Sequence, residues 1–269
     1  MQSLHYPVLL VAAYLIGSIP FSQIIAALFR PGIRLRETGS ENIGATNVFV
    51  NAGPLAGFIA LLLDMGKGIF VLFLARAWMS WSFSEDLWQI LSLSVFVILG
   101  HDYPVFTGFK GGKGLAAMEG FLLFFGTAWA VLVHLPQAQF LFHKDRRRAM
   151  ALANVLVLLM FPLMSLLWHI ESLTDIGWLG WDFTRLFGEP VLQHEALSVF
   201  SLIWMLMFFM QRVLDTPGLR EDVKKGVSFP RAFFIRGLFE LFPLESDYRR
   251  PDPRMPMGEE ALFRKKEKE

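Results

Sequence analysis

The chain alternates long apolar runs with short polar segments. A run of about 20 apolar residues can cross the bilayer as a helix, and several runs here approach or exceed that length. The apolar runs cover residues 4–29, 55–78, 87–99, 115–125, 129–142, 149–168 and 195–213. The pattern predicts an all-α integral membrane protein with about seven transmembrane helices, some of them short or broken. If residues 115–142 instead form one broken hairpin that does not cross, five crossings remain and the orientation is unchanged.

The charged residues between the apolar runs predict the orientation of the chain. Positive residues follow the first, third and fifth runs, and the most basic segment is HKDRRR at residues 143–148. The loop at residues 169–194 carries four acidic residues against Arg185 alone. Because Lys and Arg are enriched in cytoplasmic loops, we expect the N-terminus outside and the C-terminus in the cytoplasm. No Lys or Arg precedes the first run, which therefore indicates a retained helix rather than a cleaved signal peptide.

After the last apolar run, the sequence divides into two parts of different composition. We expect a membrane-embedded domain at residues 1–215, followed by a cytoplasmic or interfacial amphipathic segment at residues 216–243. That segment contains SFPRAFFIRGLFELFP, in which charged residues alternate with bulky apolar ones, as is typical of an interfacial helix. Residues 244–269 contain three prolines and many charges of both signs, and this composition predicts a disordered tail.

The composition narrows the possible functions. Of the 269 residues, 54% are hydrophobic and only 18% are charged, which is too apolar for a soluble domain of this size. The chain has no cysteine, so disulfides, a thiol nucleophile and cysteine-bound metals are excluded. The net charge of +1 does not favour a nucleic-acid partner. No metal site and no cofactor are expected.

A glycine-rich stretch, GHDYPVFTGFKGGKG at residues 100–114, interrupts the apolar pattern. Glycines can present backbone N–H groups without a blocking side chain, and Lys110 and Lys113 add positive charge. Lys113 also lies where the next helix is expected to begin, and a helix N-terminus favours an anion. We therefore expect a phosphate-binding loop, while close helix packing through small residues remains the alternative. The stretch is not a Walker A loop, because Gly114 follows Lys113 where Ser or Thr would be needed.

A second polar segment, RETGSENIGATNV at residues 36–48, lies between the first two runs. Its hydroxyl and amide side chains are grouped around two glycines and suit an oxygen-rich ligand. The same residue types also build turns and helix caps, so both interpretations stay open for this segment alone. Both polar segments are predicted to face the same side of the membrane, and this favours a binding site.

Some ionisable residues lie within or beside the expected spans. Asp64 and Lys67 are three residues apart and so share one helical face. Ionisable groups inside a span usually face a partner or a polar cavity, so the pair either locks helices together or contributes to a substrate site. His101 could act as a base or hold the loop by hydrogen bonds. Asp102 beside it would repel phosphate, unless it points away or tunes His101.

Four motifs together resemble one family. GSIPFSQIIA at residues 17–26, TGSENIGATNV at 38–48, LLDMGKG at 62–68 and LGHDYPVFTGFKGGKG at 99–114 are similar to signatures of the bacterial acyl-phosphate:glycerol-3-phosphate acyltransferases, often called PlsY. The resemblance implies a multi-pass enzyme of the bacterial inner membrane. Such an enzyme transfers a fatty acyl group from acyl phosphate to the 1-hydroxyl of glycerol 3-phosphate, giving lysophosphatidic acid for phospholipid biosynthesis.

The resemblance and the residues together give a set of expected site residues. The expected catalytic residues are Ser40, His101 and Lys113. The expected substrate-binding or phosphate-binding residues are Asn42, Gly44, Thr46, Asn47, Lys67, Lys110, Gly111, Gly112 and Gly114. The implied partners are acyl phosphate, glycerol 3-phosphate and membrane lipid, without nucleic acid. Because acyl phosphate is a mixed anhydride with a good leaving group, positioning and charge stabilisation suffice and no enzyme nucleophile is required.

The sequence departs from the family pattern at four positions. Val50 stands where the family has arginine, Ala151 where it has serine, and Leu219 and Asp222 where it has histidine and asparagine. A charge-assisted hydrogen bond is worth about 1.5–3 kcal/mol, so these changes support an alternative function. In that alternative the chain is a non-catalytic membrane protein of the same fold, which binds a lipid or phosphate ligand or supports a partner enzyme.

Overall fold

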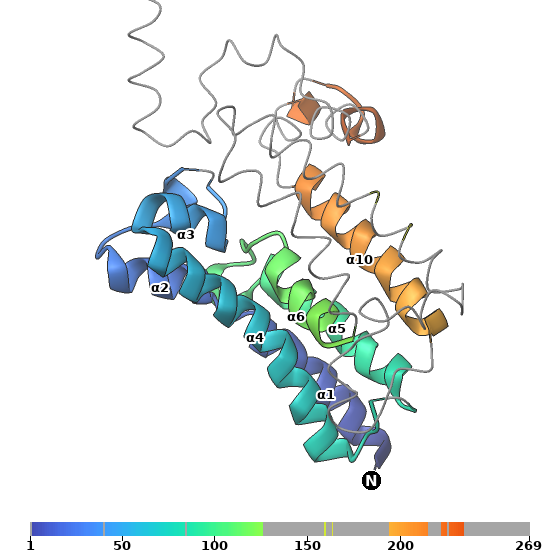
Figure 1. Cartoon of the computed structure of the whole chain (residues 1–269). Coiled ribbons are helices and arrows are strands. Elements are labelled where there is room, and N and C mark those ends of the chain that lie inside the picture. Colours follow the sequence, from blue (N-terminus) through green and yellow to red (C-terminus); the bar gives the residue numbers. More distant parts are fainter. Residues whose placement is uncertain are drawn as a thin grey trace, which may run out of the picture. The chain divides into compact units, whose positions relative to one another are not determined.

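The computed structural model describes residues 2–39, 41–83, 85–125, 194–214, 222–224 and 226–233, together with residues 159 and 163. Throughout these residues the regular structure is helical and no strand occurs (Figure 1). The predicted all-α fold is confirmed for this part of the chain. The predicted span at residues 129–142 lies outside it, as does the span at 149–168 apart from residues 159 and 163. The tail at residues 244–269 and the position of Ala151 also lie outside it.

The described backbone falls into two compact units. The first contains residues 2–74 and 93–120, and the second contains residues 75–92 and the described residues from 121 onward. Among the described residues, three helical segments are long and apolar enough to cross a membrane: His5–Phe29, Pro54–Met79 and Leu87–Thr107. The apolar helical segments Leu115–Phe125 and Glu195–Gln211 are shorter.

The first predicted span is interrupted. Helix α1 (Gln2–Gly17) ends three residues before helix α2 (Phe21–Phe29) begins. Pro20 has no N–H to donate, and it disfavours a helical conformation at the residue before it. The continuous helix expected at residues 4–29 is therefore two helices in the first compact unit, joined by residues 18–20 (Figure 1).

Helix α4 (Pro54–Met79) has two different faces within the first unit. One face is exposed and entirely apolar, as expected of a surface that contacts lipid; it carries Leu55, Phe58, Leu62, Phe70 and Phe73. The opposite face is buried, and it carries Ala56, Ala60, Asp64, Lys67 and Val71. The helical spacing of these residues thus places the ionisable side chains of Asp64 and Lys67 inside the protein.

Glycines allow close contacts between the helices of the first unit. Helix α5 (Leu87–Asp102) crosses α1 where Gly17 meets the backbone of Val97 and where Gly100 meets the carbonyl of Tyr14. At both points a β-carbon would collide with backbone atoms of the other helix. Close packing through small residues, one of the two interpretations of the glycine-rich stretch, is therefore confirmed for Gly100.

The second polar segment has a small core of its own. It contains a 3-10 turn, η1 (Leu35–Glu37), and helix α3 (Ala45–Ala52), which packs against α2. Gln23 on α2 donates from Nε2 to the Ile33 carbonyl over 2.9 Å and accepts the Leu35 N–H at Oε1 over 3.0 Å. Beneath these bonds lies a buried apolar cluster formed by Ile25, Ala26, Ile33, Leu35, Ile43, Val48, Ala56 and Ala60. The segment is therefore a folded substructure.

The second unit is held mainly by aromatic contacts. Helix α10 (His194–Leu214) covers the predicted run at residues 195–213. Its Trp204 is buried against Phe121, with ring centroids 6.4 Å apart. Phe83 meets Phe124 edge to face with centroids 4.8 Å apart, and Arg76 lies 4.7 Å from the centre of the Phe83 ring.

Candidate functional site

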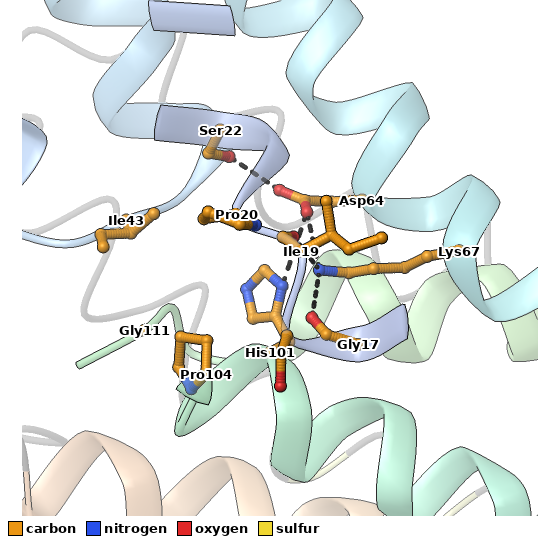
Figure 2. Close-up of a pocket in the computed structure, with 11 residues that line it drawn as sticks. Gly17, Ile19, Pro20, Ser22, Ile43, Asp64, Lys67, His101, Pro104 and Gly111 are labelled. Carbon is orange, nitrogen blue, oxygen red and sulfur yellow. Dashed lines mark hydrogen bonds and ion pairs between the residues drawn. The ribbon is translucent and has the colours of Figure 1, made fainter. Parts of the chain in front are cut away.

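A buried polar cluster lies at the interruption between α1 and α2 (Figure 2). The Lys67 ammonium is 3.0 Å from Oδ1 of Asp64, and the side chains of both residues are only 1% exposed. Ser22 on α2 donates its hydroxyl to Oδ2 of Asp64 over 2.7 Å. Nδ1 of His101, at the end of α5, lies 3.6 Å from Oδ1 of Asp64. Three helices therefore contribute to one ionic cluster.

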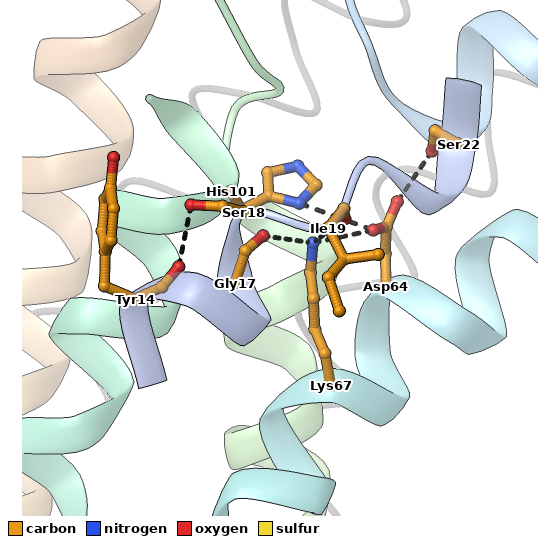
Figure 3. A network of polar contacts seen from close by, with 8 residues as sticks. All are labelled: Tyr14, Gly17, Ser18, Ile19, Ser22, Asp64, Lys67 and His101. Carbon is orange, nitrogen blue, oxygen red and sulfur yellow. Dashed lines mark hydrogen bonds and ion pairs between the residues drawn. The ribbon is translucent and has the colours of Figure 1, made fainter. Parts of the chain in front are cut away.

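Lys67 also satisfies the backbone at the helix interruption (Figure 3). Its Nζ donates to the carbonyls of Gly17 over 2.9 Å and Ile19 over 3.3 Å. Carbonyls released at a break inside a membrane need a partner, because lipid supplies none. An ammonium has three N–H donors, and Asp64 and the two carbonyls use all three. This geometry favours the interpretation that the Asp64–Lys67 pair locks helices, and it leaves Lys67 no donor for a substrate phosphate.

A small cavity lies beside this cluster (Figure 2). The space open to the centre of a water molecule is about 10 Å³, which is room for about one water. Its walls are formed by Gly17, Ser18, Ile19, Pro20, Ser22, Ile43, Asp64, Lys67, His101, Pro104 and Gly111. The cavity therefore joins the ionic cluster to both polar segments, and glycerol 3-phosphate exceeds its volume.

The glycine-rich loop folds back on the end of α5. The N–H of Gly111 donates to the Asp102 carbonyl and that of Gly112 donates to the His101 carbonyl, each over 3.0 Å. A β-carbon at Gly112 would collide with Nε2 of His101, so the glycine allows the loop to lie directly against the imidazole. Both amides were expected to face an anion, and in this arrangement they are not available to one.

The start of helix α6 (Leu115–Phe125) already has a carboxylate beside it. Gly114 precedes the helix with a φ of 72°, and a β-carbon on it would lie 2.9 Å from Oδ1 of Asp102. The Asp102 side chain is buried against this residue. The carboxylate therefore occupies the side of the loop where the sequence predicted an anion at a helix N-terminus, which disfavours a phosphate there.

Arg36 connects the two polar segments. Its Nη2 donates to the Gly111 carbonyl over 2.6 Å, and its Nη1 donates to the Glu41 carbonyl over 3.1 Å. A β-carbon at Gly112 would also lie 2.8 Å from the carbonyl oxygen of Ile43, so the two segments touch there as well. In the sequence, Arg36 is one of the positive residues that follow the first apolar run. Its one signal as a site residue was its position at the start of the polar segment.

Asn47 holds the second polar segment in shape. Its Nδ2 donates to the carbonyls of Leu35, Thr38 and Asn42 over 2.9 to 3.0 Å. Its Oδ1 accepts a 2.8 Å hydrogen bond from Nδ2 of Asn51, and the side chain is buried. Both ends of the amide are thus used within the protein. The second polar segment was expected either to bind a ligand or to build turns and helix caps. For Asn47 the structure supports turn building.

The N-terminus of α3 differs from that of α6. Gly44 is its N-cap and no side chain caps the helix, and its first turn has no acidic residue. The N–H groups of Ala45 and Thr46 are the first two of the helix, so they have no acceptor within it, and neither donates to any described residue. The Thr46 side chain is exposed, and the amide nitrogen of Asn42 lies beside Gly44. Such unpaired amides and the helix dipole favour an anion.

The structure brings together only some of the remaining residues that were expected in the site. Lys113 is half-buried in the glycine-rich loop, whereas Lys110 is exposed. Ser40 lies outside the described residues, between Gly39 and Glu41. Val50, at the position of the family's arginine, is half-buried on α3. Leu219 is also outside the described residues.

Comparison with known proteins identifies the family. The sequence profile described as glycerol-3-phosphate acyltransferase matches residues 7–216. The chain belongs to the glycerol-3-phosphate acyltransferase family. The resemblance inferred from the four motifs is thereby confirmed, and the family match extends beyond these motifs to residue 216.

Individual members of the family agree with this assignment. The glycerol-3-phosphate acyltransferase of Jannaschia sp. (strain CCS1) is 50% identical over 119 residues, which cover 44% of this chain and 54% of that protein. The matched part thus spans about half the length of this relative. The glycerol-3-phosphate acyltransferase of Syntrophomonas wolfei is 39% identical over 162 residues, or 59% of this chain and 76% of that protein.

A solved structure supports the membrane fold. A crystal structure of PlsY (YgiH), described as an integral membrane glycerol 3-phosphate acyltransferase in its glycerol 3-phosphate form, is 26% identical to this chain. The two structures superpose with a TM-score of 0.54, covering 86% of this chain and 99% of the other. The expected integral membrane fold is in agreement with this similarity.

Proposed function

We propose that the chain transfers a fatty acyl group from acyl phosphate to the 1-hydroxyl of glycerol 3-phosphate, producing lysophosphatidic acid and inorganic phosphate. Family membership and the names of the relatives support the reaction. The structural observation that carries the proposal is the junction of the two polar segments at Arg36 and Gly111. It places the uncapped N-terminus of α3 and the His101 imidazole in one folded unit, as two phosphorylated substrates would require.

The proposed site divides the expected residues into two groups. Asn42, Gly44 and Thr46 bind one phosphate at the N-terminus of α3, where amide donors are unpaired. The side chains of Lys113, Lys110 and Ser40 bind the second phosphate away from the N-terminus of α6, where the Asp102 carboxylate lies. They also neutralise the charge that develops in the transition state. Gly111, Gly112 and Gly114 shape the loop by allowing close approach. Lys67 and Asn47 act as positioning residues, because their polar atoms are used within the protein.

The reaction needs a proton acceptor but no enzyme nucleophile. The 1-hydroxyl oxygen attacks the acyl carbon, the bond from that carbon to the phosphate oxygen breaks, and phosphate leaves with the bonding electrons. His101 is proposed to take the hydroxyl proton at Nε2, the nitrogen that faces Gly112, through the one water for which the adjacent cavity has room, while Nδ1 faces Asp64. A carboxylate on one ring nitrogen fixes the imidazole so that the other can accept a proton.

The membrane arrangement is part of the proposal. The chain is proposed to be a multi-pass protein of the bacterial inner membrane with about seven transmembrane helices, an outside N-terminus and a cytoplasmic C-terminus. The proposed domain limits are residues 1–215 for the membrane-embedded acyltransferase domain, 216–243 for the amphipathic segment and 244–269 for the charged tail. Three apolar spans among the described residues support this arrangement.

The activity is tested directly with purified protein in phospholipid vesicles. Palmitoyl phosphate and radiolabelled glycerol 3-phosphate are added, and lysophosphatidic acid is measured after extraction. The expected result is product formation that Lys113→Ala reduces to background. Product no higher than that of Lys113→Ala would refute the acyltransferase proposal.

One observation favours a second candidate function. Val50 occupies the family's arginine position on α3, and Arg36 nearby already donates to two carbonyls. A non-catalytic protein that binds a lipid or phosphate ligand, or supports a partner enzyme, would tolerate this loss. It predicts binding of glycerol 3-phosphate by calorimetry without product. Growth of a strain that lacks its own acyltransferase, when rescued by this chain, would rule the second function out.

A further inference from the structure

The loop between α5 and α6 exposes several large apolar side chains. Within residues 105–110, here called the aromatic loop, Val105 is 40% exposed, Phe106 61% and Phe109 60%. Burial of large apolar side chains is favourable, so leaving two phenylalanines in water is unfavourable. An exposed apolar patch of this kind marks an interaction surface.

The aromatic loop presents these side chains in a fixed geometry. The N–H of Phe109 donates to the Pro104 carbonyl and the hydroxyl of Thr107 donates to the Lys110 carbonyl, each over 2.9 Å. Gly108 and Phe109 both adopt positive φ angles, of 64° and 60°. For a bulky residue this conformation is unfavourable. The loop therefore holds the Phe109 ring outward against a conformational cost, which indicates a selected surface.

Two features indicate what covers this surface. The apolar span Leu87–Thr107 includes the first three residues of the aromatic loop, so the loop continues directly from a segment able to cross the membrane. Lys110 at its other end is exposed and positively charged, which complements anionic lipid headgroups. A surface of aromatic rings with an adjoining lysine is typical of the membrane–water interface.

We propose that the aromatic loop is inserted into the headgroup region of the membrane that holds the protein. Phe106 and Phe109 lie at the boundary between headgroups and acyl chains, and Lys110 contacts lipid phosphates. Gly111 follows immediately, and Arg36 holds its carbonyl. The lipid contact thus fixes the depth at which the two polar segments meet. This inference concerns a membrane-binding surface. It shares Lys110 with the proposed phosphate site, so the depth measurement is made without substrate.

The absence of cysteine from the chain allows a direct depth measurement. A single cysteine is introduced as Phe106→Cys or, separately, as Phe109→Cys, and is labelled with a nitroxide. The full chain is reconstituted in vesicles of equal parts phosphatidylcholine and phosphatidylglycerol. Collisions of the label with oxygen and with a water-soluble nickel complex then give its depth. Glu37→Cys on the exposed turn η1 and Phe70→Cys on the exposed face of α4 are the aqueous and hydrocarbon references.

Both labels are expected at a depth of about 5–10 Å below the headgroup surface, between the two references. Nickel accessibility equal to that of Glu37→Cys at both positions would overturn the proposal, and so would protection from both reagents, which would indicate a protein partner. The two substitutions are independent, so one that fails to fold leaves the other to decide. Adding Lys110→Glu to Phe106→Cys should make the label shallower in these vesicles and not in pure phosphatidylcholine; equal depths in both would refute the role of Lys110.

Discussion

The guanidinium of Arg36 donates a 2.6 Å hydrogen bond to the carbonyl of Gly111, across 75 residues of sequence. The same side chain donates to Glu41 within its own segment. A charged donor shared between two carbonyls is a strong, directional link. Arg36 therefore fixes the position of the glycine-rich loop relative to the segment that carries α3.

Arg36→Ala should reduce the proposed acyltransfer through loss of this link. A charge-assisted hydrogen bond is worth about 1.5–3 kcal/mol, so we expect kcat/KM for glycerol 3-phosphate to fall at least about tenfold. Arg36→Lys should be intermediate, since an ammonium lacks the fork that reaches both carbonyls. The matched control is Arg34→Ala, which removes an exposed ion pair with Glu37 and should change activity less than about twofold. Equal effects at Arg36 and Arg34 would exclude a positioning role.

Lys67 and Lys110 should respond to substitution in opposite ways. Lys67→Met leaves Asp64 as an uncompensated buried charge, and such a loss costs about 3–5 kcal/mol. It also leaves the Gly17 and Ile19 carbonyls without their donor. We expect a large fall in the unfolding temperature measured in detergent, with KM unchanged in the protein that remains folded.

Lys110→Met is the matched control for this prediction. The exposed Lys110 side chain adds little to folding, so the unfolding temperature should stay the same while KM for the phosphorylated substrates rises. If Lys67→Met instead kept its unfolding temperature and raised KM, Lys67 would be a substrate ligand, as first expected from its place in the span.

The sequence predicts the helices far better than it predicts the contacts made by polar side chains. Apolar runs locate α4, α5 and α10 within a few residues, because lipid-facing and buried faces both require apolar side chains. Pro20 marks the interruption of the first apolar run. Because the residues on both sides of Pro20 are apolar, the pattern alone predicted one continuous helix. The partners of Lys67 are backbone carbonyls 48 and 50 residues away, and no local pattern specifies backbone acceptors.

The glycines show why the site was harder to predict than the fold. A glycine can leave its backbone N–H exposed to a ligand, or it can let another part of the protein approach closely. The residue that packs against the glycine in the folded protein decides which of the two occurs. At Gly111 and Gly112 the neighbours are the carbonyls of Asp102 and His101, which take the amides. For Asn47 the same uncertainty applied, since an amide side chain suits a turn as well as a ligand. Three carbonyls converge on its nitrogen, and only the folded segment shows this.

Thr46→Glu should weaken substrate binding without lowering the stability of the folded protein. A negative side chain in the first turn of α3 is favourable to the helix by about 0.3–1 kcal/mol, so the unfolding temperature should stay level or rise. The same charge would repel a phosphate at the unpaired amides of Ala45 and Thr46, and KM should rise at least about tenfold. Thr46→Gln, similar in size and neutral, is the control and should bind substrate more tightly than the Glu variant. If KM were unchanged in the Glu variant, the phosphate would not bind at the N-terminus of α3.

Gly112→Ala tests whether the loop must lie against His101. The added β-carbon would be 2.7 Å from Cδ2 of the imidazole and 2.8 Å from the Ile43 carbonyl oxygen. The second contact involves backbone, which cannot move aside at low cost, so the loop and the ring should separate. We expect a large loss of activity together with a lower unfolding temperature. Gly66→Ala on α4 is the matched control, because its β-carbon meets nothing within 4 Å. An alanine there should stabilise the helix by about 0.5–1 kcal/mol. If both variants retained full activity, the contact between the glycine-rich loop and His101 would not be needed for turnover, and His101 would lose its proposed role as proton acceptor.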